Sequence, residues 1–433
     1  MPNLSPLDLE NIFYSMKKLI VFTLSLACSL AALAQDTTQR VIAGRQNSAQ
    51  QENKPYVILI SADGFRYDYA EKYKAEHLLA FGNEGVKSPY MIPSFPSTTY
   101  PNHYAMATGL YPAHHGIVQN IFYDRDRKVY YNSSNKSATN DGTWYGGTPI
   151  WVLAEQQHML AANFYWVGSN ALIKDMYSTY YYMHTSKIPV NNRIQDVVNW
   201  LNLPADKRPH LITFYLPPVD DAGHEYGPNS QQVADAVLNV DSTVYELTKA
   251  VKTTGLKVNF IFVSDHGMSE PDTKNTLPTP AALDTSKFII SGDRMVVELI
   301  AKNPDDIQKT YEGLKKEAKD YDVYLRENMP EHLHSSKTDD WQNRIGDIVL
   351  LPHFPKMFNI FNKKLDRGQH GYDPATVKDV RAIFCAWGPA FKQHTVITPF
   401  PNVDIYPLVA QILGLNITDK IDGTKELANE VLK

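Results

Sequence analysis

The chain has 433 residues, of which 21% are charged, and a formal net charge of -5. This length allows one large α/β domain or two ordinary ones, and the balanced composition excludes a disordered chain or one that coats nucleic acid through general positive charge. A mildly acidic protein can still bind phosphate esters, because bound metal ions concentrate positive charge locally.

The N-terminus has the pattern of an export signal. A basic stretch at 16–18 precedes the apolar run Leu19–Ala27, and the small residues at 32–34 are typical of a cleavage site. We therefore interpret residues 1–34 as an N-terminal extension and a bacterial-type signal peptide, with translation starting at Met16. The run is too short to span a membrane, so we expect a periplasmic or extracellular protein without a transmembrane anchor. Lipid attachment at Cys28 is disfavoured, because the residues before it fit a lipobox poorly.

Continuous apolar runs predict strands that are buried on both faces. After a polar segment, 35–54, which we expect to be a flexible lead-in, the runs are Tyr56–Ser61, Phe164–Trp166, His210–Leu216, Val258–Ser264 and Arg381–Ala386.

Helical patterns lie between these runs. In Gln231–Gly255 apolar residues recur at steps of three and four, and Val403–Leu413 is a second such segment, closed by Gly414. Strands that alternate with helices predict an α/β fold with a mostly parallel sheet covered on both faces. We expect 55–433 to form one main domain, with a small strand–helix–strand subdomain inserted at about 295–345.

Three predicted strands end in residues that suit a metal. Asp63 follows the first strand, Asp220 and His224 follow His210–Leu216, and Asp265 and His266 follow Val258–Ser264. Because the carboxyl ends of parallel strands meet at one edge, these side chains should gather there. Carboxylates mixed with imidazoles are a donor set that zinc prefers.

A possible nucleophile precedes a predicted helix. Pro101 is typical of a first helical turn, so the hydroxyls of Thr98 and Thr99 lie at the positive end of that helix, where an alkoxide forms more easily. The commoner role for such a threonine is to cap the helix. The residues alone leave both interpretations open.

Seven segments, in order along the chain, resemble the nucleotide pyrophosphatase/phosphodiesterase family of the alkaline phosphatase superfamily. The resemblance extends from about residue 56 to about residue 415, which makes it far more specific than one short motif. The segments are Ile58–Tyr67, Pro93–Asn120, Leu216–Pro228, Val263–Met268, Arg344–Leu351, Gly368–Pro374 and Ala382–Lys392.

The resemblance implies an alkaline phosphatase-like fold and two zinc ions. By position, Asp220, His224 and His370 resemble the ligands of one zinc. Asp221 adjoins Asp220, but the spacing Asp-x-x-x-His favours Asp220. The ligands of the other zinc are implied to be Asp63, Thr99, Asp265 and His266.

The same resemblance assigns catalytic and substrate-binding roles. Thr99 matches the nucleophile, since it stands directly before aromatic-Pro-Asn, and Asn120 matches the asparagine that donates to the phosphate. Tyr100 and Tyr215 occupy substrate-binding positions, where an aromatic face can stack on a base. A further aromatic partner within Tyr177–Tyr182 stays unassigned, because Val167 stands where the family has proline.

The chemistry of these groups is consistent. Thr99 alkoxide and the three aspartates carry four negative charges, which balance two divalent zinc ions that activate the attacking oxygen and stabilise the departing one. Asn120 offers a fixed donor to the oxygen that gains charge. Attack by Thr99 forms a phosphoryl-threonine intermediate, which water then hydrolyses.

The predicted function is therefore that of a secreted phosphodiesterase or nucleotide pyrophosphatase with a small-molecule phosphodiester or nucleotide substrate. An alkaline phosphatase-like phosphomonoesterase and a choline-type phosphodiesterase are the alternatives. A monoesterase usually adds a cation for the extra charge, and no clear candidate adjoins these motifs. A sulfatase is disfavoured because Cys-x-Pro-x-Arg is missing, and an inactive binding protein because every expected site residue is present.

Four histidines and a cysteine have simpler interpretations. We expect structural or solvent-facing roles for His103, His114, His115 and His184, and a core position for Cys385 in its apolar strand.

Overall fold

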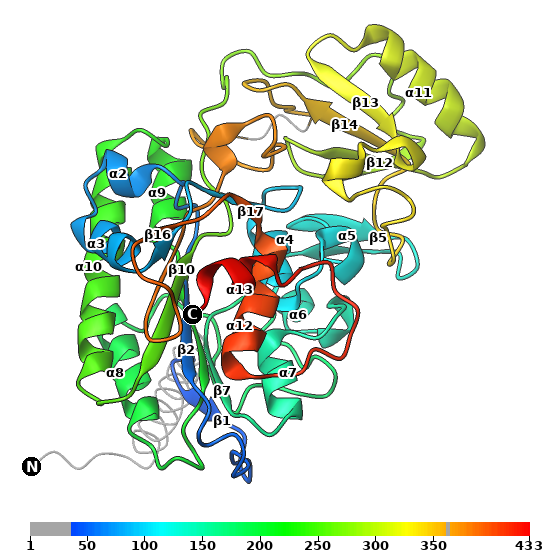
Figure 1. Ribbon diagram of the computed structural model, residues 1–433. Coiled ribbons are helices and arrows are strands. Elements are labelled where there is room, and N and C mark those ends of the chain that lie inside the picture. The colour runs from blue at the N-terminus through cyan, green and yellow to red at the C-terminus, as the bar shows by residue number, and fades with distance from the viewer. Residues whose placement is uncertain (1–35, 361–363) are drawn as a thin grey trace, which may run out of the picture.

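A nine-stranded sheet runs through the main body of the computed structural model, which describes residues 36–360 and 364–433 (Figure 1). The expected signal peptide, Met16 and Cys28 lie outside the described residues. In spatial order the strands are β1 (Gln39–Val41), β8 (Tyr180–Tyr182), β7 (Ala161–Phe164), β9 (Leu211–Leu216), β2 (Tyr56–Ala62), β10 (Val258–Val263), β15 (Phe384–Trp387), β3 (Val86–Lys87) and β16 (Thr395–Val396).

The centre of this sheet is parallel, which confirms the predicted fold class. Strands β8, β7, β9, β2 and β10 run in one direction. At the edges β1 pairs antiparallel with β8, β15 pairs antiparallel with both β10 and β3, and β16 pairs in parallel with β3. Along β2, Val57 and Leu59 pack into one hydrophobic cluster, and Ile58 and Ile60 pack into another on the opposite face. Burial on both faces explains why the strand has no polar alternation.

Helices cover both faces of the sheet (Figure 1). One face carries α2 (Tyr69–Lys72), α3 (Glu76–Glu84), α8 (Val190–Leu201), α9 (Pro218–Tyr226) and α10 (Gln231–Lys252). The other carries α4 (Thr99–Thr108), α5 (Pro112–His115), α6 (Lys136–Thr139), α7 (Ile150–Gln156), α12 (Ile405–Leu413) and α13 (Glu426–Val431). Short 3-10 turns are η1 (Gly142–Trp144), η2 (Arg326–Asn328), η3 (Glu331–Leu333), η4 (Lys378–Val380) and η5 (Asn402–Asp404).

A second, four-stranded antiparallel sheet stands beside the main body, with one helix packed on it (Figure 1). The strand–helix–strand pattern corresponds to β12, α11 and β13, while β11 and β14 extend the unit beyond 295–345 at both ends. That this unit is a subdomain of its own stays a prediction. Its elements are β11 (Phe288–Gly292), β12 (Val297–Ala301), α11 (Asp305–Glu317), β13 (Tyr321–Leu325) and β14 (Ile348–Pro352), and the remaining two-stranded pairs are β5 (Ile121–Asp124) with β6 (Val129–Asn132) and β4 (Met91–Ile92) with β17 (Phe400–Pro401).

The polar lead-in forms one strand of the main sheet. Within 36–54, β1 pairs with β8, and the side chain of Asn47 bonds to the carbonyl oxygens of Ala205 and Arg208 and to the amide of Leu160. The side chain of Asn47 thus satisfies backbone groups of neighbouring loops, although most side chains of this segment are exposed. That the lead-in is flexible stays a prediction.

Two strand boundaries also differ from expectation. The strand expected at Phe164–Trp166 is β7, which begins at Ala161 and ends at Phe164, because Tyr165 adopts a left-handed backbone with φ of 68°. Strand β15 begins three residues after Arg381, and its Cys385 lies in the core as expected. None of the helices formed by residues 36–360 and 364–433 combines the length and the apolar character needed to cross a bilayer.

Candidate active site

The expected ligands meet at one edge of the main sheet. Strands β9, β2 and β10 are adjacent and parallel, so Asp63 after β2, Asp220 on α9 after β9, and Asp265 after β10 project from the same edge. Helix α4 brings Thr99 to this edge, and the loop after β14 brings His370.

One group brings two imidazole rings and a carboxylate together. His224 Nε2 lies 3.1 Å from His370 Nε2, and Asp220 Oδ1 lies 3.5 Å and 3.7 Å from these two nitrogens. The other ring nitrogens face carbonyl oxygens: His224 Nδ1 is 3.0 Å from Gly368 O, and His370 Nδ1 is 3.0 Å from Ser97 O. If each Nδ1 donates to its carbonyl, both Nε2 atoms are free as lone-pair donors to a cation.

A second group adjoins the first. His266 Nε2 lies 3.0 Å from Asp265 Oδ2, 3.5 Å from Asp63 Oδ1 and 3.2 Å from Thr99 Oγ1. Its Nδ1 is 2.8 Å from Gly267 O, and its ring stacks on that of His370 with 3.6 Å between centroids. His266 is therefore the residue at which the two groups meet.

Burial makes these charges costly without a cation. Burial, and then the charges of Asp265 and Asp220, raise the pKa of Asp63 well above its ordinary value. Burial and the neighbouring His266 and His224 hold the pKa of His370 well below its ordinary value, which keeps its imidazole neutral. A nearby divalent ion reverses this balance, because it stabilises the carboxylates and binds neutral imidazoles.

The donor set fits two divalent ions. Ligand atoms of Asp63, Asp265 and His266 all lie within 4.8 Å of one another, and so do those of Asp220, His266 and His370. Among the described side chains, one carboxylate oxygen on each of the three aspartates is buried and has no hydrogen-bond partner. Buried polar atoms are normally satisfied, and bound cations would satisfy these three oxygens.

The start of α4 separates the two threonines. Thr98 occupies the N-cap position, but its hydroxyl caps no backbone amide; Thr99 is the first helical residue. The Thr99 hydroxyl faces His266, whereas Thr98 Oγ1 is buried and has no partner within the described part of the chain. Neither side chain acts as the helix cap that was the alternative interpretation.

Asn120 and Tyr215 are held in place by specific bonds. Asn120 Oδ1 accepts a hydrogen bond from the backbone amide of Tyr100 at 2.9 Å, which orients its amide group at the start of α4. The Tyr215 hydroxyl donates to Asp63 Oδ2 at 2.5 Å. Tyr215 thus contacts a candidate ligand residue, a role for which its sequence position gave no signal.

A pocket of about 320 Å³ opens beside Thr99 and is lined by the rings of Tyr100 and Tyr215. No residue of Tyr177–Tyr182 lines it, whereas the exposed His184, two residues after β8, is one of several aromatic side chains that do. Its place beyond the carboxyl end of a parallel strand is a signal that the sequence contained. The other lining residues are Ser133, Ser134, Lys136, Thr139, Asn140, Tyr165, Trp166, Val167, Gly168, Asn170 and Met183.

His103 contacts two residues of the candidate site from the protein interior. It is fully buried, its Nε2 lies 2.9 Å from Ser61 Oγ, and its Nδ1 lies 3.0 Å from Thr99 O and 3.3 Å from Asp265 Oδ2. The expected structural role thus includes contact with a candidate ligand. The buried His115, near Pro101 O, and His114, paired with Asp422, lie among structural contacts.

Comparisons with known proteins agree with this geometry. Residues 57–373 match the family described as type I phosphodiesterase / nucleotide pyrophosphatase. The chain is 32% identical over 398 residues to ectonucleotide pyrophosphatase/phosphodiesterase family member 1 of Mus musculus, and 33% identical over 393 residues to venom phosphodiesterase CdcPDE of Crotalus durissus collilineatus. These matches cover 88% and 87% of this chain but 43% and 46% of the relatives, so the chain spans less than half of their length.

Solved structures show the same fold. Murine ectonucleotide pyrophosphatase/phosphodiesterase 5 superimposes with a TM-score of 0.80 and 27% identity, over 87% of this chain and 100% of that one, which places the fold in the alkaline phosphatase-like class. An inactive threonine-to-alanine variant of the same murine protein, solved in complex with AMP, superimposes equally well, with a TM-score of 0.80 and 26% identity over 87% of this chain and 100% of that one.

Proposed function

Because the chain belongs to the type I phosphodiesterase/nucleotide pyrophosphatase family, we propose that it hydrolyses phosphodiester or phosphoanhydride bonds of nucleotides, with Thr99 as the nucleophile. The observation that carries this proposal is the direction of the Thr99 hydroxyl. It lies at the amino end of α4, 3.2 Å from His266, beside a pocket large enough for an organic substituent of the phosphate.

The reaction has two balanced steps. In the first, Thr99 Oγ bonds to phosphorus and loses its proton, while the bond from phosphorus to the leaving oxygen breaks and that oxygen gains a proton. In the second, a water oxygen bonds to phosphorus, the bond to Thr99 Oγ breaks, and the threonine recovers its hydroxyl proton. The net reaction is hydrolysis to a nucleotide monoester and an alcohol or a phosphate.

The protein positions the reacting groups. Two divalent metal ions, when bound by Asp220, His224 and His370 and by Asp63, Asp265, His266 and Thr99, supply positive charge to the reacting oxygens. We propose that both are zinc, since mixed imidazole and carboxylate donors suit that ion. The amide of Asn120, oriented by its bond from the Tyr100 backbone, donates to the phosphate oxygen that gains charge.

The pocket beside Thr99 supports a nucleotide substrate. Tyr100 forms one of its walls, and an aromatic face can stack on any base. The murine relative that was solved with AMP supports the same substrate class. The choline-type phosphodiesterase stays the alternative, because the aromatic faces of this pocket can also contact a quaternary ammonium. The pattern of residues 16–34 supports the proposal that the enzyme is exported.

One observation favours a second function, that of a phosphomonoesterase. Lys136 lines the same pocket, and a dianionic monoester needs a cation that a diester does not. We place it second, because phosphate groups bind at the metal ligands and Lys136 stands among residues that line the organic side of the pocket.

The test compares esters that share one leaving group. We expect the nitrophenyl ester of AMP and bis-nitrophenyl phosphate to have kcat/KM values at least about tenfold above that of nitrophenyl phosphate. Lys136→Ala, compared with wild type, should leave this order unchanged. A preference for the monoester that is lost in Lys136→Ala would establish the second function instead.

A further inference from the structure

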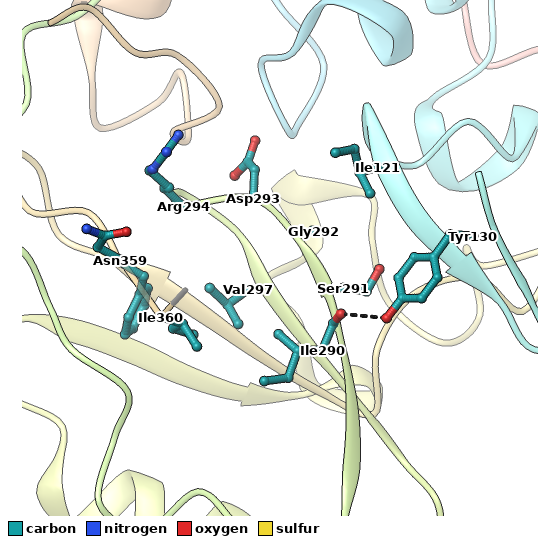
Figure 2. A pocket seen from close by; sticks show the side chains of 11 residues that line it. Ile121, Tyr130, Ile290, Ser291, Gly292, Asp293, Arg294, Val297, Asn359 and Ile360 are labelled. Carbon is teal, nitrogen blue, oxygen red and sulfur yellow. Dashed lines mark hydrogen bonds between the residues drawn. The ribbon is translucent and has the colours of Figure 1, made fainter. Parts of the chain in front are cut away.

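A second pocket of about 320 Å³ lies between the four-stranded sheet and the β5–β6 hairpin (Figure 2). Ile121 and Tyr130 come from the hairpin and line one side, while β11 and the start of β12 form its floor. Arg294 and the segment 358–360 line the opposite side. Most of this lining is apolar, which is typical of a site for a small organic group.

This pocket adjoins the candidate active site through two neighbouring residues. Ile121 directly follows Asn120, the proposed phosphate donor. Asp293, at the rim in Figure 2, packs against Gly371, since a Cβ placed on that glycine would lie 3.5 Å from Asp293 Oδ2. Gly371 in turn follows His370, a candidate ligand. The pocket therefore lies on the His370 side of the site, whereas the first pocket lies on the side of Tyr100.

The polar groups at the rim offer both a donor and an acceptor. Arg294 makes no ion pair within the described residues, and its Nη2 donates to Lys364 O at 2.8 Å. Asp293 Oδ1 accepts from the amides of Met295 and Val296 at 2.8 and 3.0 Å, which holds the carboxylate in position. Such a rim suits a ligand with an anionic group and with hydroxyl or amino donors.

The β5–β6 hairpin fixes the ring of Tyr130 at the wall of the pocket. Tyr130 is 49% exposed, yet its hydroxyl donates to Ile290 O at 3.0 Å, and its ring packs edge-on against Tyr123. The ring is thus fixed in place before a ligand arrives, which lowers the entropic cost of binding. Pockets of about 300 Å³ are at the small end of ligand sites, so this one suits a ring system better than a long acyl chain.

We propose that this pocket binds the half of the substrate that leaves, and that it suits a second nucleotide. The inference rests on the proposed function: a phosphodiester carries two organic groups, and only one can occupy the pocket beside Tyr100. The departing base contacts Tyr130 and the aliphatic side chains of β11, its phosphate contacts Arg294, and Asp293 accepts from its hydroxyl or amino groups.

The experiment varies the leaving group while the retained group stays AMP. Wild type, Tyr130→Ala and Arg294→Ala are assayed with the nitrophenyl ester of AMP and with diadenosine diphosphate, from which AMP departs. Arg294→Ala should lower kcat/KM for diadenosine diphosphate about tenfold, as the loss of one charge contact predicts, and leave the nitrophenyl ester, whose leaving group carries no phosphate, within about twofold. Tyr130→Ala should lower kcat/KM for diadenosine diphosphate about tenfold and that for the nitrophenyl ester by less, because the nitrophenyl ring is smaller than a base. Tyr130→Phe, which keeps the ring, should retain most of the activity.

Matched controls come from the same elements. Val129→Ala lies on the same hairpin and Lys309→Ala on the exposed face of α11; neither residue lines the pocket, and both variants should behave as wild type. Equal losses with both substrates, or no loss with either, would overturn the leaving-group pocket. Hydrolysis of the nitrophenyl ester alone by wild type would also overturn it but leave the proposed function standing. Hydrolysis of neither ester would overturn both.

Discussion

The two threonines at the start of α4 permit a sharp test of the nucleophile. Valine has nearly the shape of threonine but no hydroxyl, so Thr98→Val and Thr99→Val each remove one oxygen. Thr98 Oγ1 is buried and has no partner within the described chain, and an unsatisfied buried hydroxyl costs about 1–3 kcal/mol. Thr98→Val should therefore raise the free energy of unfolding by about 1 kcal/mol and leave turnover within about twofold.

Thr99→Val should have the opposite profile. Its hydroxyl faces His266 and caps no amide, so the fold should keep its stability while kcat falls by at least about 10³-fold, as expected when a nucleophile is removed. Thr99→Ser should keep a measurable part of kcat, because a primary hydroxyl can still attack. At least six of the seven proposed protein ligands remain in every variant, so most metal binding should persist.

The assay combines kcat for the nitrophenyl ester of AMP, the thermal unfolding midpoint and the metal content of each variant. Trapping of a labelled phosphoryl-protein after an acid quench should succeed in wild type and fail in Thr99→Val. If Thr98→Val were inactive and Thr99→Val active, the assignment would be off by one residue. If both stayed active, threonine would not be the nucleophile, and water would have to attack phosphorus directly.

Three further outcomes are expected. Protein purified without chelator should contain close to two zinc equivalents per chain. Chelation should abolish turnover, and added zinc should restore it. If no metal bound after reconstitution, the proposed metal ligands would be wrong. Tyr215→Phe removes the hydroxyl that donates to Asp63, so the zinc affinity of the Asp63 site should fall about 10–100-fold while KM changes little. An unchanged zinc affinity with a raised KM would mean that Tyr215 contacts only the substrate. Burial, and then the charge of Asp340, raise the pKa of Glu298 from 4.5 to about 8, so its carboxyl holds a proton in the fold that the unfolded chain releases between those pH values. The free energy of unfolding should fall as pH rises through this window. Glu298→Gln, but not the exposed Glu312→Gln, should reduce that slope in denaturation curves recorded at pH 5 to 9.

Local patterns in the sequence predicted the central architecture correctly. The apolar runs at Tyr56–Ser61 and Val258–Ser264 are continuous because both faces of those strands are buried. Burial on both faces requires an apolar residue at nearly every position, so the sequence itself reveals it. The gathering of Asp63, Asp220 and Asp265 followed from parallel strands with a common carboxyl edge. The assignment of Thr99 over Thr98, and of His370 as a ligand, came from the family resemblance and not from residue patterns.

Other features depended on contacts between distant segments. Strand β1 lies in a polar segment that periodicity does not reveal, because its pairing with β8 is a backbone interaction across about 140 residues of chain. The exposed His184, and no tyrosine of Tyr177–Tyr182, lines the pocket beside Thr99, because the path of the chain after β8 decides which side chain reaches that pocket. Residue type and spacing determined which groups stand at the ends of the strands. The direction of each side chain, such as the Tyr215 hydroxyl toward Asp63, was decided by tertiary packing, since it depends on neighbours that are far away in the sequence.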